Sequence, residues 1–159
     1  MAVDMFLKID GIPGESQDKT YRDAIEVLAW NWGAKGGDSS IRPGTGAAAA
    51  KTTLQGFSFT KQVDRATPKI YESLMQGKHI KDCTFSCRKP GEKDKYLEIK
   101  MLDCLLSSVS TGCEIGEGRP TENVILLFNK VQLDYYYKDA SGVKPVSFKW
   151  DLLSSGGKF

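Results

Sequence analysis

The side chains that could perform acid–base or nucleophilic chemistry are few in this sequence of 159 residues. The single histidine, His79, rules out a histidine-rich metal site and leaves little room for a Ser-His-Asp arrangement. Its position just after an expected helix is more typical of a structural or surface residue than of a general base. Aspartate and glutamate are dispersed, and no pair has a setting that marks an acid and a base. We therefore expect no catalytic residue and no enzymatic activity.

The four cysteines are even in number but do not form a disulfide framework. Cys83 and Cys87 are four residues apart on an expected strand, which places their Cα atoms roughly 13 Å apart, too far for a disulfide. A CxxxC pair with one histidine in the chain is a weak zinc signal. We expect Cys83, Cys87 and Cys104 to be small buried side chains and Cys113 to be exposed in a glycine-rich loop.

Motifs for cofactors, nucleic acids and membranes are missing from the sequence as well. Neither GxGxxG nor GxxxxGK[ST] occurs, and the glycines between 33 and 46 lie between expected strands instead of opening a helix. A net charge of +2 with scattered lysines argues against nucleic acid. Without a run of 18 apolar residues, membrane insertion is not expected. The N-terminal MAVDMFLKID alternates like a strand and does not resemble a secretory signal. We expect no cofactor.

Alternation of apolar and polar residues predicts an all-β chain with one short helix. The helix is expected to be capped by Thr67, to have Pro68 in its first position and to end at Gly77. We expect one domain over residues 1–159, built as a closed or nearly closed antiparallel β-barrel of two packed sheets with the helix at its flank. The expected strands are residues 3–9, Ile25–Gly33, Thr53–Thr60, Ile80–Lys89, Tyr96–Leu106, Glu122–Tyr137 and a last one through Val146, Phe148 and Trp150.

The segment Glu122–Tyr137 is longer than an ordinary strand of about 5–6 residues. One parity carries Val124 and Leu126, and the other carries Leu133 and Tyr135. A strand with apolar residues on both faces must be covered on both sides. Because no helical layer is available for the second side, we expect another copy of the chain to contact these residues.

The residues resemble the hemolysin-coregulated protein (Hcp) family, the tube subunit of the bacterial type VI secretion system. The resemblance runs in order over nearly the whole chain and is weakest in the loop from Ala34 to Lys51 and after Leu153. The matching segments are MAVDMFLKIDGIPGES, IEVLAWNWG, GFSFTKQVDRATPKIYESLMQGKHI, YLEIKMLDCLLSSVSTG and PTENVILLFNKVQLDYYY.

The resemblance implies a structural subunit that forms hexameric rings, which stack into a tube. It implies a spike protein at the tube tip, a contractile sheath around it, and small effector proteins carried and chaperoned in the lumen. The protein would be made in the bacterial cytoplasm and secreted by the machine itself, without a signal peptide.

Two groups of residues are expected to serve this assembly. Trp30 and Trp32 share one face of their strand and suit the core, so Ala29 and Asn31 on the other face are expected to line the lumen and to contact effectors. Ring stacking is expected to involve the long loop, the Pro-Gly turn and the C-terminal tail, through Asp38, Ile41, Arg42, Pro90, Gly91 and Lys158.

Two other classes of protein remain as alternatives. A monomeric β-barrel could hold a small apolar ligand, although Phe, Trp, Leu and Met at inward positions predict a solid interior. An OB-like nucleic-acid binder would need a more basic chain than this one. Native mass separates these alternatives, because the tube protein must form a ring.

Overall fold

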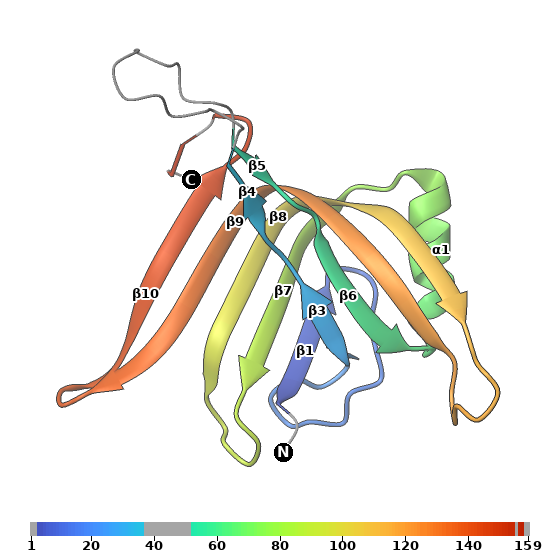
Figure 1. Ribbon diagram of the computed structural model, residues 1–159, viewed down its shortest axis with the longest axis horizontal. Coiled ribbons are helices and arrows are strands. Elements are labelled where there is room, and N and C mark those ends of the chain that lie inside the picture. The colour runs from blue at the N-terminus through green and yellow to red at the C-terminus, as the bar shows by residue number, and fades with distance from the viewer. Residues whose placement is uncertain (1–2, 37–51, 155, 158–159) are drawn as a thin grey trace.

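The computed structural model describes residues 3–36, 52–154 and 156–157, and Figure 1 shows its arrangement. Eight strands form one antiparallel sheet in the order β2-β1-β7-β8-β9-β6-β3, with β10 on β9. The strands are β1 (Asp4–Ile9), β2 (Ile25–Glu26), β3 (Ala29–Asn31), β6 (Phe57–Gln62), β7 (Ile80–Arg88), β8 (Lys95–Gly112), β9 (Thr121–Asp139) and β10 (Gly142–Asp151). A separate ribbon consists of β4 (Ala34–Lys35) and β5 (Thr53–Leu54).

The prediction of an antiparallel all-β fold with one short helix is confirmed. The described residues do not form two packed sheets, because eight of their strands form one curved sheet around the core. The path of paired strands is open, and its two end strands, β2 and β3, are neighbours in the chain. Between them, the Val27 N–H donates to the Met5 carbonyl of β1 (3.0 Å) and the Leu28 N–H donates to the Thr60 carbonyl of β6 (2.8 Å). The segment 25–31 therefore contacts both ends of the sheet.

The core inside this sheet is packed with aromatic and aliphatic side chains. Phe57, Phe59, Phe85 and Met101 are at most 1% exposed. Trp30 packs on two of these rings, with centroid distances of 5.8 Å to Phe57 and 5.0 Å to Phe85. Interdigitated rings of this kind fill the space that a ligand-binding barrel would leave open.

The long hairpin of β8 and β9 contains an irregularity that changes which residues face the core. Leu102 pairs with Lys130 and Cys104 pairs with Phe128, so the register is unbroken across Asp103 and Asn129, which lie between these pairs. Asp103 has a positive φ of 54°, and the Asn129 amide donates to its carboxylate. The buried positions change parity at this point on both strands, from Met101 to Cys104 on β8 and from Phe128 to Val131 on β9.

This change of parity overturns the expectation that β9 has two apolar faces. Val124 and Leu126 lie before the irregularity, Val131 lies after it, and all three are fully buried in the same core. The prediction that Val124 and Leu126 contact a neighbouring copy is therefore wrong, because the chain's own core already covers them. Leu133 is half-buried and Tyr135 is 50% exposed.

Helix α1 (Thr67–Gln76) lies against the sheet at the end of β8 (Figure 1). It ends at Gly77, whose φ of 61° is left-handed, as predicted. The predicted start is wrong, because the N-cap is Ala66 and Thr67 is already helical. The Thr67 hydroxyl instead accepts hydrogen bonds from the Asp64 N–H (3.1 Å) and the Lys61 ammonium (3.2 Å).

The cysteines occupy the predicted environments. Cys83, Cys87 and Cys104 are buried, and Cys113 is exposed. Burial raises the pKa of the Cys87 thiol to about 11. The adjacent Cys104 thiol, together with burial, raises the pKa of Cys83. The thiols of Cys83 and Cys87 are therefore protonated and unreactive at neutral pH.

Candidate functional site

An outward-facing surface without ionisable side chains covers part of four adjacent strands, β3, β6, the first part of β9 and the last part of β8. The strand register aligns its residues in two rows. We call this surface the neutral patch; its rows are Ala29–Thr60–Asn123–Ser110 and Asn31–Ser58–Ile125–Ser108. The strands present uncharged and mostly small polar side chains here, because their alternate residues, such as Phe57, Phe59 and Val124, fill the core.

Local contacts hold the residues of the neutral patch in place. The Thr60 hydroxyl lies 2.6 Å from Oδ1 of Asn123 on the next strand. Gly56 lets the chain entering β6 pass close to β9, because a Cβ there would lie 2.9 Å from Cγ2 of Ile125. The Trp32 indole N–H donates to the Gln55 carbonyl at 2.9 Å, which fixes the segment next to β3.

The outward surface on the other half of the sheet has the opposite character. Its rows cross β1, β7, β8, β9 and β10, and Glu98 stands directly opposite Asp134. Both acids are only 3% exposed. Lys95 and Lys100 contact Glu98, while Gln132 and Ser147 donate hydrogen bonds to Asp134. The remaining side chains in these rows include Lys8, Thr84 and Lys149.

A buried ionic cluster lies beneath the edge of the neutral patch. The Lys61 ammonium, fully buried, lies 2.9 Å from Glu122 Oε2 and 2.8 Å from Asp64 Oδ1. Glu122, also fully buried, accepts a hydrogen bond from the Thr111 hydroxyl at 3.2 Å, and that hydroxyl lies 2.6 Å from the Tyr71 hydroxyl of α1. The cluster therefore ties β6, β8, β9 and the helix together at one corner of the fold.

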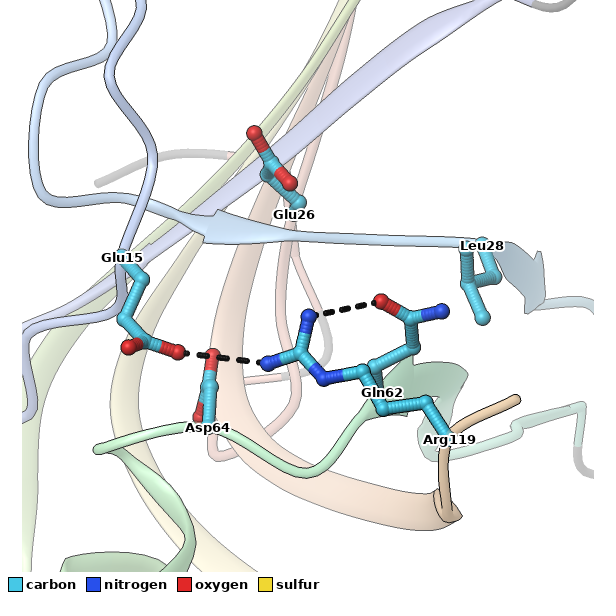
Figure 2. Close-up of a pocket in the computed structure, with 6 residues that line it drawn as sticks. All are labelled: Glu15, Glu26, Leu28, Gln62, Asp64 and Arg119. Carbon is cyan, nitrogen blue, oxygen red and sulfur yellow. Dashed lines mark hydrogen bonds and ion pairs between the residues drawn. The ribbon is translucent and has the colours of Figure 1, made fainter.

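Arg119 organises a small pocket beside this cluster (Figure 2). Its guanidinium donates to Gln62 Oε1 (3.1 Å) and to the Val63 carbonyl (2.8 Å), and lies 3.6 Å from Glu15. The pocket measures about 60 Å³, which is room for a water molecule or two and too little for an organic ligand. The Arg119 side chain therefore joins the β8–β9 loop to β6 and to the N-terminal loop.

The hairpin of β9 and β10 extends away from the rest of the sheet (Figure 1). Its exposed side chains include apolar ones. Cross-strand pairing places Leu133 opposite Phe148 and Tyr135 opposite Val146, on the face that continues from the buried Val131. Tyr135, Val146 and Phe148 are 50%, 59% and 41% exposed. We call this surface the apolar wing. An exposed face that continues a core is typical of a surface covered by another chain.

The site residues predicted from the sequence lie in separate parts of the structure, and some of them lie outside the described residues. Ala29 and Asn31 are exposed and lie together in the neutral patch, while Pro90 and Gly91 form the β7–β8 turn. The stacking candidates Asp38, Ile41, Arg42 and Lys158 lie outside the described residues. Sequence reasoning missed the other members of the neutral patch, although the alternation in FSFTKQ already separates Ser58 and Thr60 from the phenylalanines.

The part of the chain that the structure describes contains neither a metal site nor a membrane-spanning helix. Within it, no group of three or more His, Cys, Asp or Glu side chains is arranged to hold a metal ion. Its helix is too short and too polar to cross a membrane.

Comparison with known proteins identifies the family. The family described as "Type VI secretion system effector, Hcp" matches residues 6–135. The chain belongs to the Hcp family. Protein hcp1 of Pseudomonas aeruginosa is 44% identical over 157 residues, which is 96% of both chains.

Solved Hcp structures share the same fold. Hcp1 of Salmonella typhimurium superposes with a TM-score of 0.83 at 31% identity, covering 99% of this chain and 100% of that one. A type VI secretion system effector of Yersinia pestis gives a TM-score of 0.76 at 36% identity, over 93% and 99% of the two chains. Membership confirms that this Hcp chain is a tube protein of the type VI secretion system and not an enzyme. Hcp proteins form homo-oligomeric rings and are secreted by that system.

Proposed function

We propose that six copies of this chain form a ring whose lumen is lined by the neutral patch, and that the rings stack into the secretion tube. The observation that carries this proposal is the division of the outward surface into an uncharged half and a charged half. A channel wall that cargo must slide along favours small, neutral side chains, because fixed charges would hold or repel cargo of either sign. In this arrangement the segment 25–31 closes the barrel of each protomer and presents Ala29 and Asn31 to the lumen.

Membership of the family supports the remaining partners of this proposal. Small effector proteins occupy the lumen, where the ring carries and chaperones them, and a spike protein sits at the tube tip. The contractile sheath surrounds the charged half of the outward surface. The protein is made in the bacterial cytoplasm before the machine secretes it. The Pro90–Gly91 turn is at one end of the protomer, and the end of β10 is at the other, which suits contacts between stacked rings (Figure 1).

Neighbouring protomers in the ring are joined by the apolar wing. Leu133 and Tyr135 remain the predicted contacts on β9, and the structure adds Val146 and Phe148 on β10 as candidates. A closed ring requires two different patches that meet head to tail, and the wing supplies one of them. Its apolar character is that of a permanent interface.

The native mass of the purified protein tests this proposal. We expect a species of about six chains of 17.5 kDa each, visible as a ring by electron microscopy. A stable monomer at micromolar concentration would contradict the ring. It would favour instead the alternative of a monomeric ligand-binding barrel, which the packed core argues against.

The effect of Asn31→Trp tests the assignment of the lumen. A tryptophan at this exposed position of the neutral patch would narrow the channel and remove an amide that can hydrogen-bond to cargo. We expect weaker retention of a small effector protein coexpressed with the ring, with ring mass unchanged. Lys8→Trp places the same side chain on the charged half and should leave retention intact. Dissociation of the Asn31→Trp ring would place this residue between subunits.

A further inference from the structure

A group of apolar side chains continues the outward surface of the neutral patch. Leu105 of β8 pairs with Leu127 of β9, and Ile125 stands two residues before Leu127 on the same face of β9. The alternate residues Leu106 and Leu126 are buried in the core, so the side chains of Leu105, Ile125 and Leu127 point outward. We call these three residues the apolar belt.

The apolar belt is open to solvent in the protomer. Leu127 is 44% exposed, while Leu105 and Ile125 are half-buried. Gly56, beside them at the entry to β6, has no side chain that could cover them. A Cβ at Gly56 would lie 2.9 Å from Cγ2 of Ile125 and 3.0 Å from Cδ2 of Leu127. Both side chains therefore pack over the bare backbone of this glycine, and a side chain in its place would push them aside.

The surroundings of the apolar belt favour an apolar partner surface. Ser58 and Ser108 stand on either side of Ile125 in its row of the neutral patch, and both are uncharged. An apolar surface that covers the belt therefore removes apolar area from water without removing water from an ionised group. A charged partner surface would lose its own hydration and gain no opposite charge. In the proposed ring, the belts of all copies lie at one level of the lumen, so one cargo protein contacts several of them.

From these observations we infer that the apolar belt holds a small effector protein in the lumen by binding an apolar patch on the surface of that protein. The inference rests on the proposed lumen and names the chemistry by which it selects cargo. Leu105 and Leu127 lie within the long strands β8 and β9 and not in turns, so cargo in the channel reaches them more directly than an adjoining ring does. The polar rows of the neutral patch then form the surface along which cargo moves, and the belt is where cargo is retained.

Peptide binding to purified rings tests this contact. The probe is a fluorescein-labelled helical peptide with leucines along one face, and a matched peptide carries serines in their place at the same net charge. Fluorescence anisotropy measures the Kd of each peptide. We expect only the leucine peptide to bind, and Leu127→Ser to weaken its binding about tenfold, the order of magnitude for one lost leucine contact. Because the contact is apolar, raising the salt concentration about tenfold should not weaken it.

Two control variants make each outcome decisive. Leu127→Met keeps an apolar side chain, and Ile115→Ser removes a fully exposed one from the β8–β9 loop, so both should bind the leucine peptide like the wild type.

Equal Kd values for the two peptides, or for wild-type and Leu127→Ser rings, would overturn the inference while leaving the ring standing. An equal loss in Ile115→Ser would overturn it as unspecific. Dissociation of Leu127→Ser rings would place this residue between protomers and overturn it as well. If the wild type is itself a monomer, the proposed ring fails, and the inference fails with it. Weaker binding to intact Leu127→Ser rings, restored in Leu127→Met, supports the contact.

Discussion

Replacing Lys61 with methionine is expected to lower the free energy of unfolding by about 3–5 kcal/mol, because the change leaves buried carboxylates without their cation. Glu122 is fully buried and Asp64 is only 9% exposed, and both lie within 3 Å of the Lys61 ammonium. Methionine matches the lysine stem in shape, but it carries no charge and cannot donate a hydrogen bond to the two carboxylates. Urea unfolding followed by circular dichroism measures the loss.

Two further variants separate the buried charge from a general loss of packing. Lys78→Met alters an exposed lysine in the turn after α1 and should change stability by no more than about 0.5 kcal/mol. The double variant Lys61→Met with Glu122→Gln should be more stable than Lys61→Met alone, because the uncompensated charge at position 122 is gone. Equal stabilities of Lys61→Met and Lys78→Met would show that the buried cluster does not hold this corner together.

The sequence predicts the parts of this fold that depend on short-range pattern. Alternation places β1 and β7, and the punctuation by Pro68 and Gly77 places α1, because each signal needs only a few adjacent residues. The position of Lys61 shows the limit of this reasoning. It follows Phe57 and Phe59 on the inward side of β6, but a lysine faces the core only when a partner is there. Its partner Glu122 is 61 residues away and is supplied by the register of β6 against β9.

The parity of β9 is a second case in which local pattern misleads. Leu126 and Phe128 are two residues apart, but the next buried residue, Val131, is three further on. That spacing does indicate an irregularity, but it equally fits a strand with two apolar faces. Only the contact between Asp103 and Asn129 distinguishes these cases, and that contact depends on the register of two strands. The interface residues Val124 and Leu126 were misassigned for this reason.

The neutral patch was only partly predictable for the same physical reason. Ala29 and Asn31 follow from the two tryptophans that alternate with them, which is local information. The two rows combine residues from four strands, and these residues are separated by as many as 81 positions in sequence, from Ala29 to Ser110. Each strand alone shows small polar residues that would be ordinary on any solvent-exposed face. Their alignment into one uncharged surface appears only when the strands are paired.

Replacing Phe148 with aspartate is expected to convert the ring into single chains of 17.5 kDa. Phe148 is 41% exposed on the apolar wing and stacks on Trp150, with ring centroids 6.4 Å apart. Aromatic anchors at the centre of an interface commonly contribute 2 kcal/mol or more, and burying an unpaired carboxylate there adds a desolvation penalty. The same contact recurs between every two neighbouring protomers, so the substitution weakens every subunit interface of the ring. Analytical ultracentrifugation measures the distribution of masses.

The matched control for this change is Ile115→Asp, which introduces the same charge at a fully exposed apolar residue of the β8–β9 loop. Because Phe148 lies outside the buried core, its variant should keep a cooperative unfolding transition, so that a loss of rings cannot be attributed to unfolding. If Phe148→Asp rings persist while Ile115→Asp rings dissociate, the loop and not the wing joins the protomers. If only Phe148→Asp dissociates, the wing is the interface. The apolar face that continues the core of each protomer is then completed by its neighbour.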